Sequence, residues 1–553
     1  MNEAFEVLDA AALRGWSEHG LRSLLAVRGR IDALNVFPVP DSDTGTNLVR
    51  TLAGALCHAS RLPAHADPAE LTAAAARGAL YSARGNSGII LSQAIRGFAS
   101  AVAAGGDLDG AGLADALAVV AAGARAAVAT PVEGTILTAA DEAAAAARDA
   151  PAGASLLVVA EAAARAAQEA LGRTPSQLAA LRGPGVVDSG AAGFTILLAT
   201  LAAVLAGKNL SPRARADRAR RSLDRARDAA AAVAAASAGG SGDAGPVPAH
   251  GFHPDDHDHG AGEFEVMYVL RASEPDADAL RERLGAVGHS VAVVGGPDGA
   301  AGGLWHVHVH ADVPLETLAR VGTMEQVCVR SLRESARGDV GVVACTRAPG
   351  LAAPLARAGA TVALHPDAAG IARAAADTGA HEVLVLPCDD ASARVADDVC
   401  PAPGRAAGSA ARQPWRVVGT RTELAVLAVA SEWVAGQGAA AQAERAERLA
   451  GRARTTALDL PTSDVTDAGG ATATATAASD AEASAVAAAV GALLRGEDEV
   501  VTVVLGARVL AEPARRDAVV AAVEAAVREA APDAEVLVLD GAQERPDLLV
   551  GVE

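Results

Sequence analysis

The sequence predicts a multidomain protein with an all-helical N-terminal region followed by two α/β regions. Three observations support this expectation. Residues 1–207 read as helical patterns separated by Gly, Pro and Asn loops, with hardly a strand-like run. Residues 263–335 alternate strands with a helix, and residues 336–553 repeat strand and helix in the manner of a doubly wound, mostly parallel sheet. A chain of 553 residues has room for roughly three or four such domains.

The composition limits the possible classes of function. Apolar residues make up 51% of the chain but aromatic residues only 2%, so we expect cores of Ala, Val and Leu. A formal net charge of -20 argues against non-specific nucleic-acid binding. The sequence holds one lysine, Lys208, and no GxxxxGK(S/T) segment, which excludes ATP chemistry of the Walker type.

The cysteines and the N-terminal segment indicate the compartment. The five cysteines are scattered and include no CxxC pair, which favours a reducing environment. The N-terminal segment carries acids early and no basic n-region, so it does not read as a signal peptide. Ala-rich runs such as Ala114–Thr130 are interrupted by charged residues and do not read as membrane spans. We therefore expect a soluble, cytoplasmic protein.

The most informative stretch is the aspartate loop Asn35–Asn47, which reads NVFPVPDSDTGTN. Its prolines hold the chain extended, and Asp41 and Asp43 then precede an apolar helix that Thr46 or Asn47 is placed to cap. Carboxylates at the start of a helix suit a hard cation such as Mg²⁺, whose other ligands would be phosphate oxygens. An acidic turn that only caps a helix explains the same residues equally well.

Three further loops start helices with small residues. They are Ser82–Gly88, Thr130–Leu137 and Gly183–Gly190. Glycine and serine let backbone N–H groups approach an anion, to which a helix N-terminus adds partial positive charge. Arg84 would neutralise a phosphate and Ser87 would donate a hydrogen bond to it, although an ordinary helix start is the alternative. If these loops converge at one end of a bundle, they form a phosphate cradle facing the aspartates.

Residues 208–262 are expected to be a linker. Within them, Pro212–Asp228 is an Arg/Asp-rich helical run that reads as a solvated face. The segment His250–His259 holds four histidines among acids, which is typical of adventitious metal binding. A flexible, non-catalytic tether is the preferred interpretation.

The middle region, residues 263–335, contains an unusual strand at Leu304–His310. Because side chains alternate along a strand, His306, His308 and His310 share one face. Histidines two residues apart on a strand can share a metal such as Zn²⁺. A lone histidine there is usually structural, but three in alternation favour a polar site.

Residues 336–553 are expected to form the C-terminal α/β region. Its predicted strands are Val340–Ala344, Thr361–Leu364, Glu382–Leu386, Arg416–Val418, Glu499–Leu505, Glu535–Leu539 and Asp547–Gly551. A low-complexity stretch near Gly469–Ser479 separates the last three of these strands from the first four. The last three strands surround a predicted helix at Pro513–Ala531. We interpret Cys388 as a small buried side chain rather than a reactive thiol.

Four segments, in this order and spacing, resemble one known family. They read NVFPVPDSDTGTN, SARGNSG, PVEGTIL and GVVDSGAAGF. They are similar to the L-type nucleotide-binding domain of dihydroxyacetone kinase, and more closely to its version in the ATP-binding subunit of bacterial fatty-acid kinase. The resemblance implies an eight-helix barrel that binds ATP through two Mg²⁺ ions, with Asp41 and Asp43 as metal ligands. The residues that it places at or next to the nucleotide are Asn35, Thr44, Thr46, Asn47, Ser82, Arg84, Gly85, Asn86, Ser87, Gly88, Thr135 and Asp188.

The resemblance extends into the rest of the chain. In that family the histidine pair of the middle region joins a cysteine at a zinc site, and the position of this cysteine falls on Glu265 here. The resemblance thus implies a Glu265–His308–His310 zinc site. The alternative is a metal-free site whose histidines position substrate or transfer a proton. The C-terminal region resembles the lipid-binding DegV fold, although LPCD stands where an LPN motif is usual.

The resemblance implies a phosphotransferase. It would transfer the γ-phosphoryl group of ATP to a fatty-acid carboxylate presented by a separate DegV-like lipid-binding partner, and so form an acyl phosphate. The family also suggests a homodimer. Two alternatives stay open, namely a kinase for a small ketone or polyol such as dihydroxyacetone, and a non-catalytic ATP-binding scaffold.

Overall fold

A computed structural model of the chain describes thirteen stretches of residues. They are 6–37, 42–105, 108–128, 130–182, 186–207, 211–238, 262–298, 302–333, 339–400, 414–433, 438–452, 454–460 and 475–552. Asp41, Gly183–Gly185, His250–His259 and residues 469–474 lie outside them, so the expectations for those residues stay predictions. The chain divides into two compact units. Unit 1 is Met1–Ala261, Arg271–Gly285 and Ser290–His308, and unit 2 is Gly262–Leu270, Ala286–His289 and Val309–Glu553.

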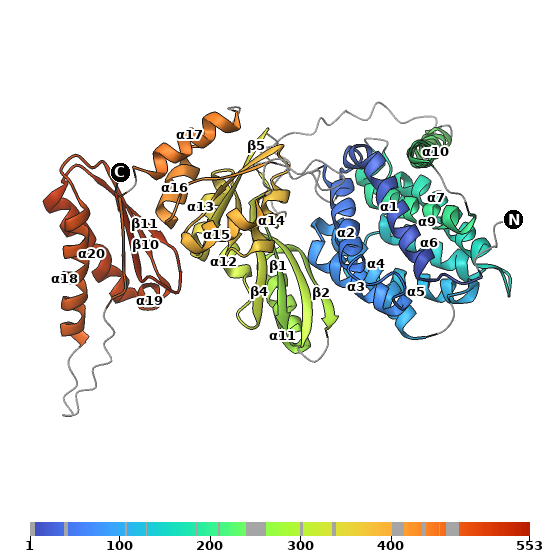
Figure 1. Cartoon of the computed structure of the whole chain (residues 1–553), viewed down its shortest axis with the longest axis horizontal. Helices are drawn as coiled ribbons and strands as arrows, with labels where there is room; N and C mark the ends of the chain where they lie inside the picture. The colour runs from blue at the N-terminus through green and yellow to red at the C-terminus, as the bar shows by residue number, and fades with distance from the viewer. Residues whose placement is uncertain are drawn as a thin grey trace, which may run out of the picture. The chain divides into compact units, whose positions relative to one another are not determined.

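The N-terminal region is helical, as expected. Its helices are α1 (Ala10–Asp32), α2 (Thr44–Ala59), α3 (Pro68–Ser82), α4 (Gly85–Ala103), α5 (Gly110–Ala126), α6 (Ile136–Arg148), α7 (Leu156–Gln177), the short α8 (Ala179–Arg182) and α9 (Ser189–Leu205). Each long helix packs against the next, and α9 returns to α1 (Figure 1). Joined by short loops and packed side by side, the helices run up and down. Alternate helix starts therefore share one end of the region.

Small side chains hold these helices close together. Alanines such as Ala139, Ala143 and Ala163 are fully buried in the shared core, where larger side chains would separate the axes. A Cβ atom added to Gly97 of α4 would lie 2.8 Å from the carbonyl oxygen of Val119 in α5, so this crossing requires glycine. Although the chain has few aromatic residues, its small side chains let the helices pack closely, so the core is densely packed.

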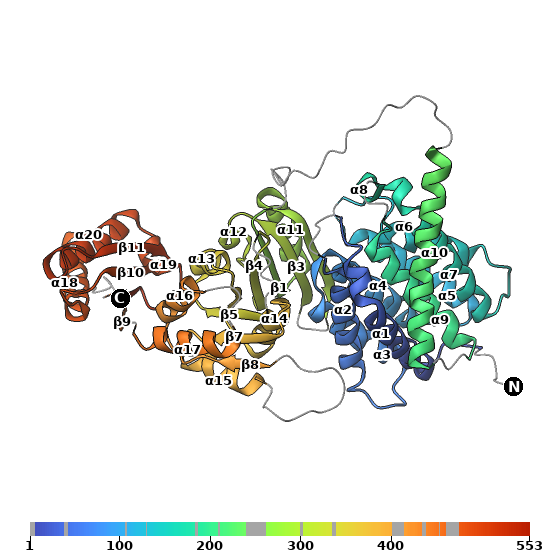
Figure 2. The same cartoon turned by 90° about the horizontal axis from the view of Figure 1, so that it is seen from above.

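Helix α10 (Pro212–Ala238) corrects an expectation. It was expected to be a solvated part of the linker, but it packs on α7, α1 and α9, and Figure 2 shows it lying along the other helices. Ala219, Leu223 and Ala226 join the core of the helical region, and Arg30 of α1 pairs with Asp224 at 2.5 Å. The expectation is wrong because the charges mask an apolar stripe at helical spacing. The helical region therefore extends beyond residue 207.

An eight-stranded sheet has the order β2–β3–β1–β4–β6–β5–β7–β8. Its strands are β1 (Phe264–Ala272), β2 (His289–Pro297), β3 (Gly303–Ala311), β4 (Thr323–Ser331), β5 (Val340–Thr346), β6 (Thr361–Leu364), β7 (Glu382–Leu386) and β8 (Trp415–Val417). β5 pairs in parallel with β6 and β7, and β7 pairs in parallel with β8, as expected. β4 pairs antiparallel with β6, so strands from the middle and C-terminal regions join one sheet.

Helices connect the strands of this sheet. They are α11 (Glu274–Val287), α12 (Pro314–Thr317), the 3-10 helix η3 (Pro349–Leu351), α13 (Ala352–Arg357), α14 (Ala368–Asp377) and α15 (Asp390–Val399). Helices α16 (Glu423–Ser431) and α17 (Ala439–Ala450) follow β8, before the first strand of the second sheet. The helix between β6 and β7, α14, contacts β4, β5 and β6, as a crossover connection between parallel strands requires.

A second, four-stranded sheet has the order β11–β10–β12–β9. Its strands are β9 (Arg454–Leu458), β10 (Val500–Leu505), β11 (Glu535–Asp540) and β12 (Leu548–Val552), and its helices are α18 (Ala475–Leu493), α19 (Ala507–Leu510) and α20 (Pro513–Ala530). β10 runs parallel to β11, but β12 is antiparallel to β10 and β9, so this sheet is mixed. Buried valines such as Val486, Val503 and Val523 pack the helices on the sheet. Among the described residues, no helix is long and apolar enough to span a membrane.

Candidate nucleotide site

A cavity of about 300 Å³ lies in unit 1 where α4, α6 and α9 begin. Each of the three predicted glycine-bearing loops contributes to its wall. The wall includes Asn86 and Ser87 of the first loop, Thr130, Val132 and Thr135 of the second, Asp188, Ser189 and Gly190 of the third, and Phe37 of the aspartate loop. The predicted convergence of these loops is therefore observed for the residues that the structure describes.

Direct contacts join the aspartate loop to two of the others. Ser189 Oγ, at the start of α9, donates a hydrogen bond to Thr44 Oγ1, at the start of α2, over 3.1 Å. Gly85, at the start of α4, has a φ of 53°, and a Cβ there would lie 2.7 Å from Asn47 Nδ2. A side chain at position 85 would thus push the α4 start away from α2, which explains a glycine at this point.

Asp188 connects two helix starts at the cavity wall. Its Oδ1 accepts the Ala191 N–H at 2.6 Å, which caps α9, and its carboxylate also accepts backbone N–H groups of Gly190 and Ile136 of α6. Burial raises the pKa of Asp188 to about 6, against the opposing effect of these three hydrogen bonds. The carboxylate therefore organises the wall by holding two helix N-termini together.

The aspartate loop differs in detail from the sequence-based expectation. Asp43, not Thr46 or Asn47, is at the N-cap position of α2, and its side chain makes no capping hydrogen bond. Instead Asn47 Nδ2 donates to Asp43 Oδ1 at 2.7 Å. Thr46, expected at the nucleotide, donates from both its N–H and its hydroxyl to Asp32, each over 2.9 Å.

Asp32 is a residue that sequence reasoning missed. It is the last residue of α1 and is partly buried; burial raises its pKa, and the two hydrogen bonds from Thr46 lower it. The available signal was an acid three residues before Asn35, at the end of a predicted helix. Nothing in the sequence indicated that its partner would be Thr46, fourteen residues later.

Ser82 and Arg84, two of the predicted phosphate ligands, contact other parts of the protein in the structure. The Arg84 guanidinium is buried and donates from Nη1 to the carbonyl oxygen of Ala83 at 2.8 Å. The Ser82 hydroxyl lies directly against Gly54 of α2, where no Cβ atom would fit. Among the described residues of this loop, Asn86 and Ser87 line the cavity. A direct phosphate contact by Ser82 or Arg84 stays a prediction.

The loop before α6 is held by a polar network. The Thr138 hydroxyl accepts the Gly134 N–H at 2.9 Å and donates to Glu133 at 2.6 Å, while Arg125 donates to Glu133 at 3.1 Å. These bonds from Thr138 and Arg125 lower the pKa of Glu133. Gly134 has a φ of 79°, a conformation that favours glycine. The loop is therefore fixed from outside, so that Val132 and Thr135 face the cavity.

The polar groups of the aspartate loop and of the helix starts at the cavity fit a hydrated divalent cation and a phosphate chain. The Asp43 carboxylate is oriented by Asn47 rather than used for capping, and carboxylate oxygen is the donor that Mg²⁺ prefers. The start of α4, whose N-cap residue Arg84 makes no side-chain capping bond, offers backbone N–H groups to an anion, whereas side chains of Thr135 and Asp188 already accept those at the starts of α6 and α9. The buried Asn35, the first residue of the aspartate loop, adds a further polar side chain.

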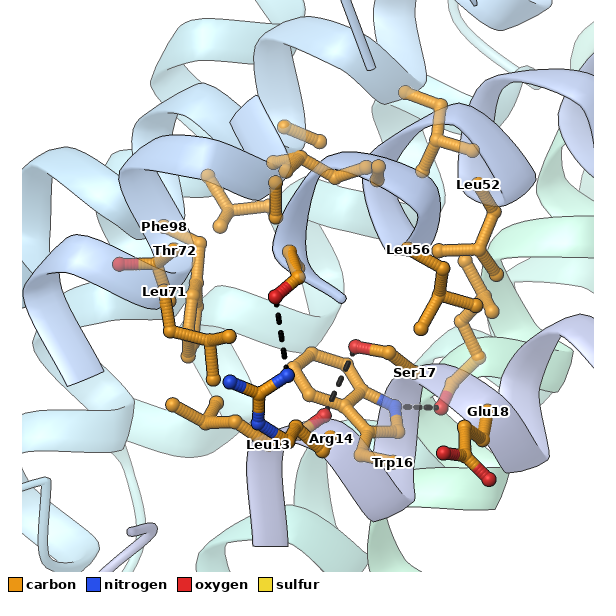
Figure 3. Close-up of a pocket in the computed structure, with 18 of the residues that line it drawn as sticks. Leu13, Arg14, Trp16, Ser17, Glu18, Leu52, Leu56, Leu71, Thr72 and Phe98 are labelled. Atoms are coloured by element: carbon orange, nitrogen blue, oxygen red, sulfur yellow. Dashed lines mark hydrogen bonds between the residues drawn. The ribbon is translucent and has the colours of Figure 1, made fainter. Parts of the chain in front are cut away.

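A second cavity, of about 160 Å³, lies among the helices of the N-terminal region. Figure 3 shows its mainly apolar lining, which includes Leu52, Leu71 and Phe98. Trp16 packs edge-on against Phe98 and donates from Nε1 to the carbonyl oxygen of Leu197 at 2.9 Å. A triphosphate needs polar partners, so this apolar cavity does not suit a nucleotide.

The middle region brings the three predicted zinc ligands together. Glu265, His308 and His310 are buried, and each offers a ligand atom within 4.8 Å of the others. However, Arg330 Nε pairs with Glu265 Oε2, while Glu265 Oε1 lies 3.8 Å from His310 Nε2. The guanidinium already neutralises the carboxylate, and a divalent cation beside it would be repelled. This arrangement favours the metal-free alternative over zinc.

The burial of these histidines bears on their predicted catalytic role. His306, His308 and His310 are at most 3% exposed. His308 Nδ1 lies 3.1 Å from the carbonyl oxygen of Ser290 on the neighbouring strand. Such burial supports a structural role for these side chains. Catalysis by His308 and His310 stays a prediction.

Comparisons with known proteins agree with this geometry. Residues 38–203 match the DAK2 domain, and residues 261–338 match the middle domain of FakA-like fatty acid kinase proteins. Protein YloV of Bacillus subtilis (strain 168) is 36% identical over 196 residues, which is 35% of each chain. Uncharacterized proteins of Staphylococcus aureus strains USA300 and NCTC 8325 / PS 47 are each 38% identical over 165 residues, 30% of each chain. The matched segment thus spans about a third of these relatives.

The helical region that contains this cavity therefore resembles the DAK2 domain, a domain of the fatty acid and dihydroxyacetone kinase family. The match of the middle region narrows the kind of kinase-family protein that the chain resembles. A DAK2 domain followed by this middle domain supports a FakA-like protein of the fatty acid kinase type.

Proposed function

We propose that the chain is the ATP-binding subunit of a kinase that phosphorylates a fatty-acid carboxylate presented by a DegV-like lipid-binding partner. One observation supports this proposal above the others. The starts of α4, α6 and α9 meet at one cavity, and the start of α2, which carries Asp43, is joined to them through the Ser189–Thr44 hydrogen bond. A phosphate chain needs this combination of backbone N–H groups and carboxylate-held cations.

Each part of the site has a defined task in this proposal. Asp43, together with Asp41, holds Mg²⁺, which neutralises the charge of the phosphates when bound. The start of α4 at Ser87 orients the phosphates by backbone hydrogen bonds, and the positive ends of α6 and α9 add electrostatic attraction at the same cavity. The fixed loop before α6 keeps the cavity wall in place. The chain thus positions and neutralises the transferring group, and no acid or base of its own is required.

The fatty-acid acceptor and the lipid-binding partner are inferred from the middle-domain match and from the proposed DegV-like C-terminal region. A homodimer and a cytoplasmic location stay predictions. A dihydroxyacetone-like small-molecule kinase is the alternative, because the DAK2 domain alone would serve both. A non-catalytic ATP-binding scaffold is the third possibility.

One assay separates these three functions. The full chain is incubated with Mg²⁺ and ATP labelled in the γ-phosphate, with and without a fatty-acid-loaded DegV-like protein, and separately with dihydroxyacetone. Label transferred to the fatty acid only when the loaded partner is present supports the proposal. Transfer to dihydroxyacetone supports the alternative, and ATP binding without transfer in any mixture supports the scaffold. Asp43→Asn is the control that should abolish transfer while the fold is kept.

A further inference from the structure

The start of α2 is capped differently from most of its neighbours. A helix N-cap side chain normally accepts a backbone N–H from the first turn of its own helix. In the N-terminal region the helices that follow this rule are α1, α3, α5, α6, α7 and α9, capped by Asp9, Asp67, Asp109, Thr135, Ser155 and Asp188. Helix α2 has an aspartate, Asp43, in the same position, yet this side chain makes no capping bond.

The cap of α2 comes from another helix. Asp32 Oδ1, on the last turn of α1, accepts the Thr46 N–H at 2.9 Å, and Asp32 Oδ2 accepts the Thr46 hydroxyl at the same distance. Thr46 is the third residue of α2, whose N–H an N-cap side chain would ordinarily accept. Asp32, which belongs to α1, therefore caps α2 in the way that Asp67 caps its own helix, α3.

Close packing fixes this arrangement. A Cβ added to Gly45 would lie 2.5 Å from the carbonyl oxygen of Arg28 and 3.0 Å from Asp32 Oδ1. The first turn of α2 therefore rests directly on the last turn of α1, and only glycine permits the contact. The distance between Asp32 and Thr46 is thus set by the backbones rather than by flexible side chains.

We propose that Asp32 is a positioning residue of the cation site. By capping α2 from α1, it keeps the Asp43 carboxylate out of the capping role, so that Asn47 can orient this carboxylate toward the cation. Without Asp32, the nearest acceptor for the Thr46 N–H is Asp43 itself, because it is the N-cap residue. The proposal rests on the proposed function, in which Asp43 holds Mg²⁺.

The test measures binding of Mn²⁺, a spectroscopic substitute for Mg²⁺, to the full chain in the presence of ATP by electron paramagnetic resonance. Asp32→Ala removes the cap and should weaken Mn²⁺ binding about tenfold, which corresponds to about 1.4 kcal/mol. Asp32→Asn keeps an oxygen for the Thr46 N–H and an amide for its hydroxyl, so it should bind Mn²⁺ within about threefold of wild type. Asp43→Asn should abolish binding.

Asp67→Ala is the matched control. It removes a side-chain cap from α3, whose start lies after the C-terminal end of α2, away from the cavity. It should lower stability, as the loss of a helix cap does, while leaving the Mn²⁺ affinity unchanged. If Asp32 had a purely structural role, Asp32→Ala, like Asp67→Ala, would lower stability without weakening Mn²⁺ binding.

The outcomes distinguish the inference from the proposed function. If Asp43→Asn abolishes Mn²⁺ binding and Asp32→Ala leaves it at the wild-type level, the role of Asp32 is wrong and the proposed site stands. Equal losses in Asp32→Asn and Asp32→Ala also overturn the inference, because charge and not capping would then act. If Asp43→Asn binds Mn²⁺ as wild type does, the proposed function itself fails. Should Asp32→Ala not fold, Gly45→Ala, which forces the two helix turns apart, replaces it with the same expectation.

Discussion

The Ser189 hydroxyl donates a hydrogen bond to Thr44 Oγ1 over 3.1 Å and so joins two helix starts that are 145 residues apart in the sequence. Both side chains are buried, and both belong to loops that sequence analysis assigned to a nucleotide. The bond fixes the start of α2, with Asp43 before it, against the wall of the cavity.

Loss of this bond should lower stability. Thr44→Val keeps the shape of the side chain but leaves the buried Ser189 hydroxyl without its acceptor, so we expect a loss of about 1 kcal/mol in the free energy of unfolding. Urea unfolding of Thr44→Val, Ser189→Ala and the double variant gives the coupling energy. Ser60→Ala, which removes an exposed local bond to Cys57, is the control. Strictly additive losses would show that the bond contributes nothing.

Asp188 should make the stability depend on pH. Its pKa is raised from 3.8 to about 6 in the folded chain, so the folded state holds the proton more tightly than the unfolded state. The contribution of protonated Asp188 to the free energy of unfolding is complete below about pH 3.8. It is lost as the pH rises through about 6, which lowers the free energy of unfolding by about 3 kcal/mol.

Asp188→Asn removes this titration. Its free energy of unfolding, measured relative to wild type in denaturant at pH 4.5 and pH 7, should therefore improve toward pH 7. The loss of capping of α9 adds a constant cost at both values. An equal difference at the two pH values would contradict the raised pKa.

The middle-region cluster should hold no zinc. Arg330 neutralises Glu265, so metal analysis of the purified chain should find well below one zinc per chain. The double variant Glu265→Cys/Arg330→Ala removes the guanidinium and supplies a thiolate beside His308 and His310, and it should take up zinc. One tightly held zinc in wild type, lost in His308→Ala, would instead support the zinc site that the resemblance implied.

The five cysteines should differ strongly in reactivity. Cys57 is exposed and Cys400 is partly buried, whereas Cys328, Cys345 and Cys388 are buried. Burial raises the pKa of the Cys345 and Cys388 thiols, which suppresses their thiolate form. A native thiol titration should give one fast phase, absent in Cys57→Ser. A fast phase that survives in Cys57→Ser but is lost in Cys388→Ser would contradict the structural reading of Cys388.

Local sequence patterns predicted most elements correctly. Helices of the N-terminal region and the strands β5, β6 and β7 carry clear periodicity, so they were expected close to where they occur. β4 and β9 were missed, because their partly polar strands lack the alternation that marks a half-buried strand. Helix α10 was misread, since its many charges hide the buried stripe of Leu223 and its neighbours.

The site was predictable in part for a similar reason. Small residues at helix starts are visible in sequence, and the convergence of the loops follows from an up-and-down bundle. The Asp32–Thr46 cap was not predictable, because it depends on how the end of one helix meets the start of the next. The Arg330–Glu265 pair likewise joins two strands that are 65 residues apart in sequence.

The most direct test of the site is a crystal structure of the full chain with Mg²⁺ and a non-hydrolysable ATP analogue. We predict that the phosphates lie in the cavity lined by Ser87, Thr135 and Ser189, with Mg²⁺ bound to the carboxylate of Asp43. A nucleotide bound elsewhere, or a cation that does not contact Asp43, would contradict this account.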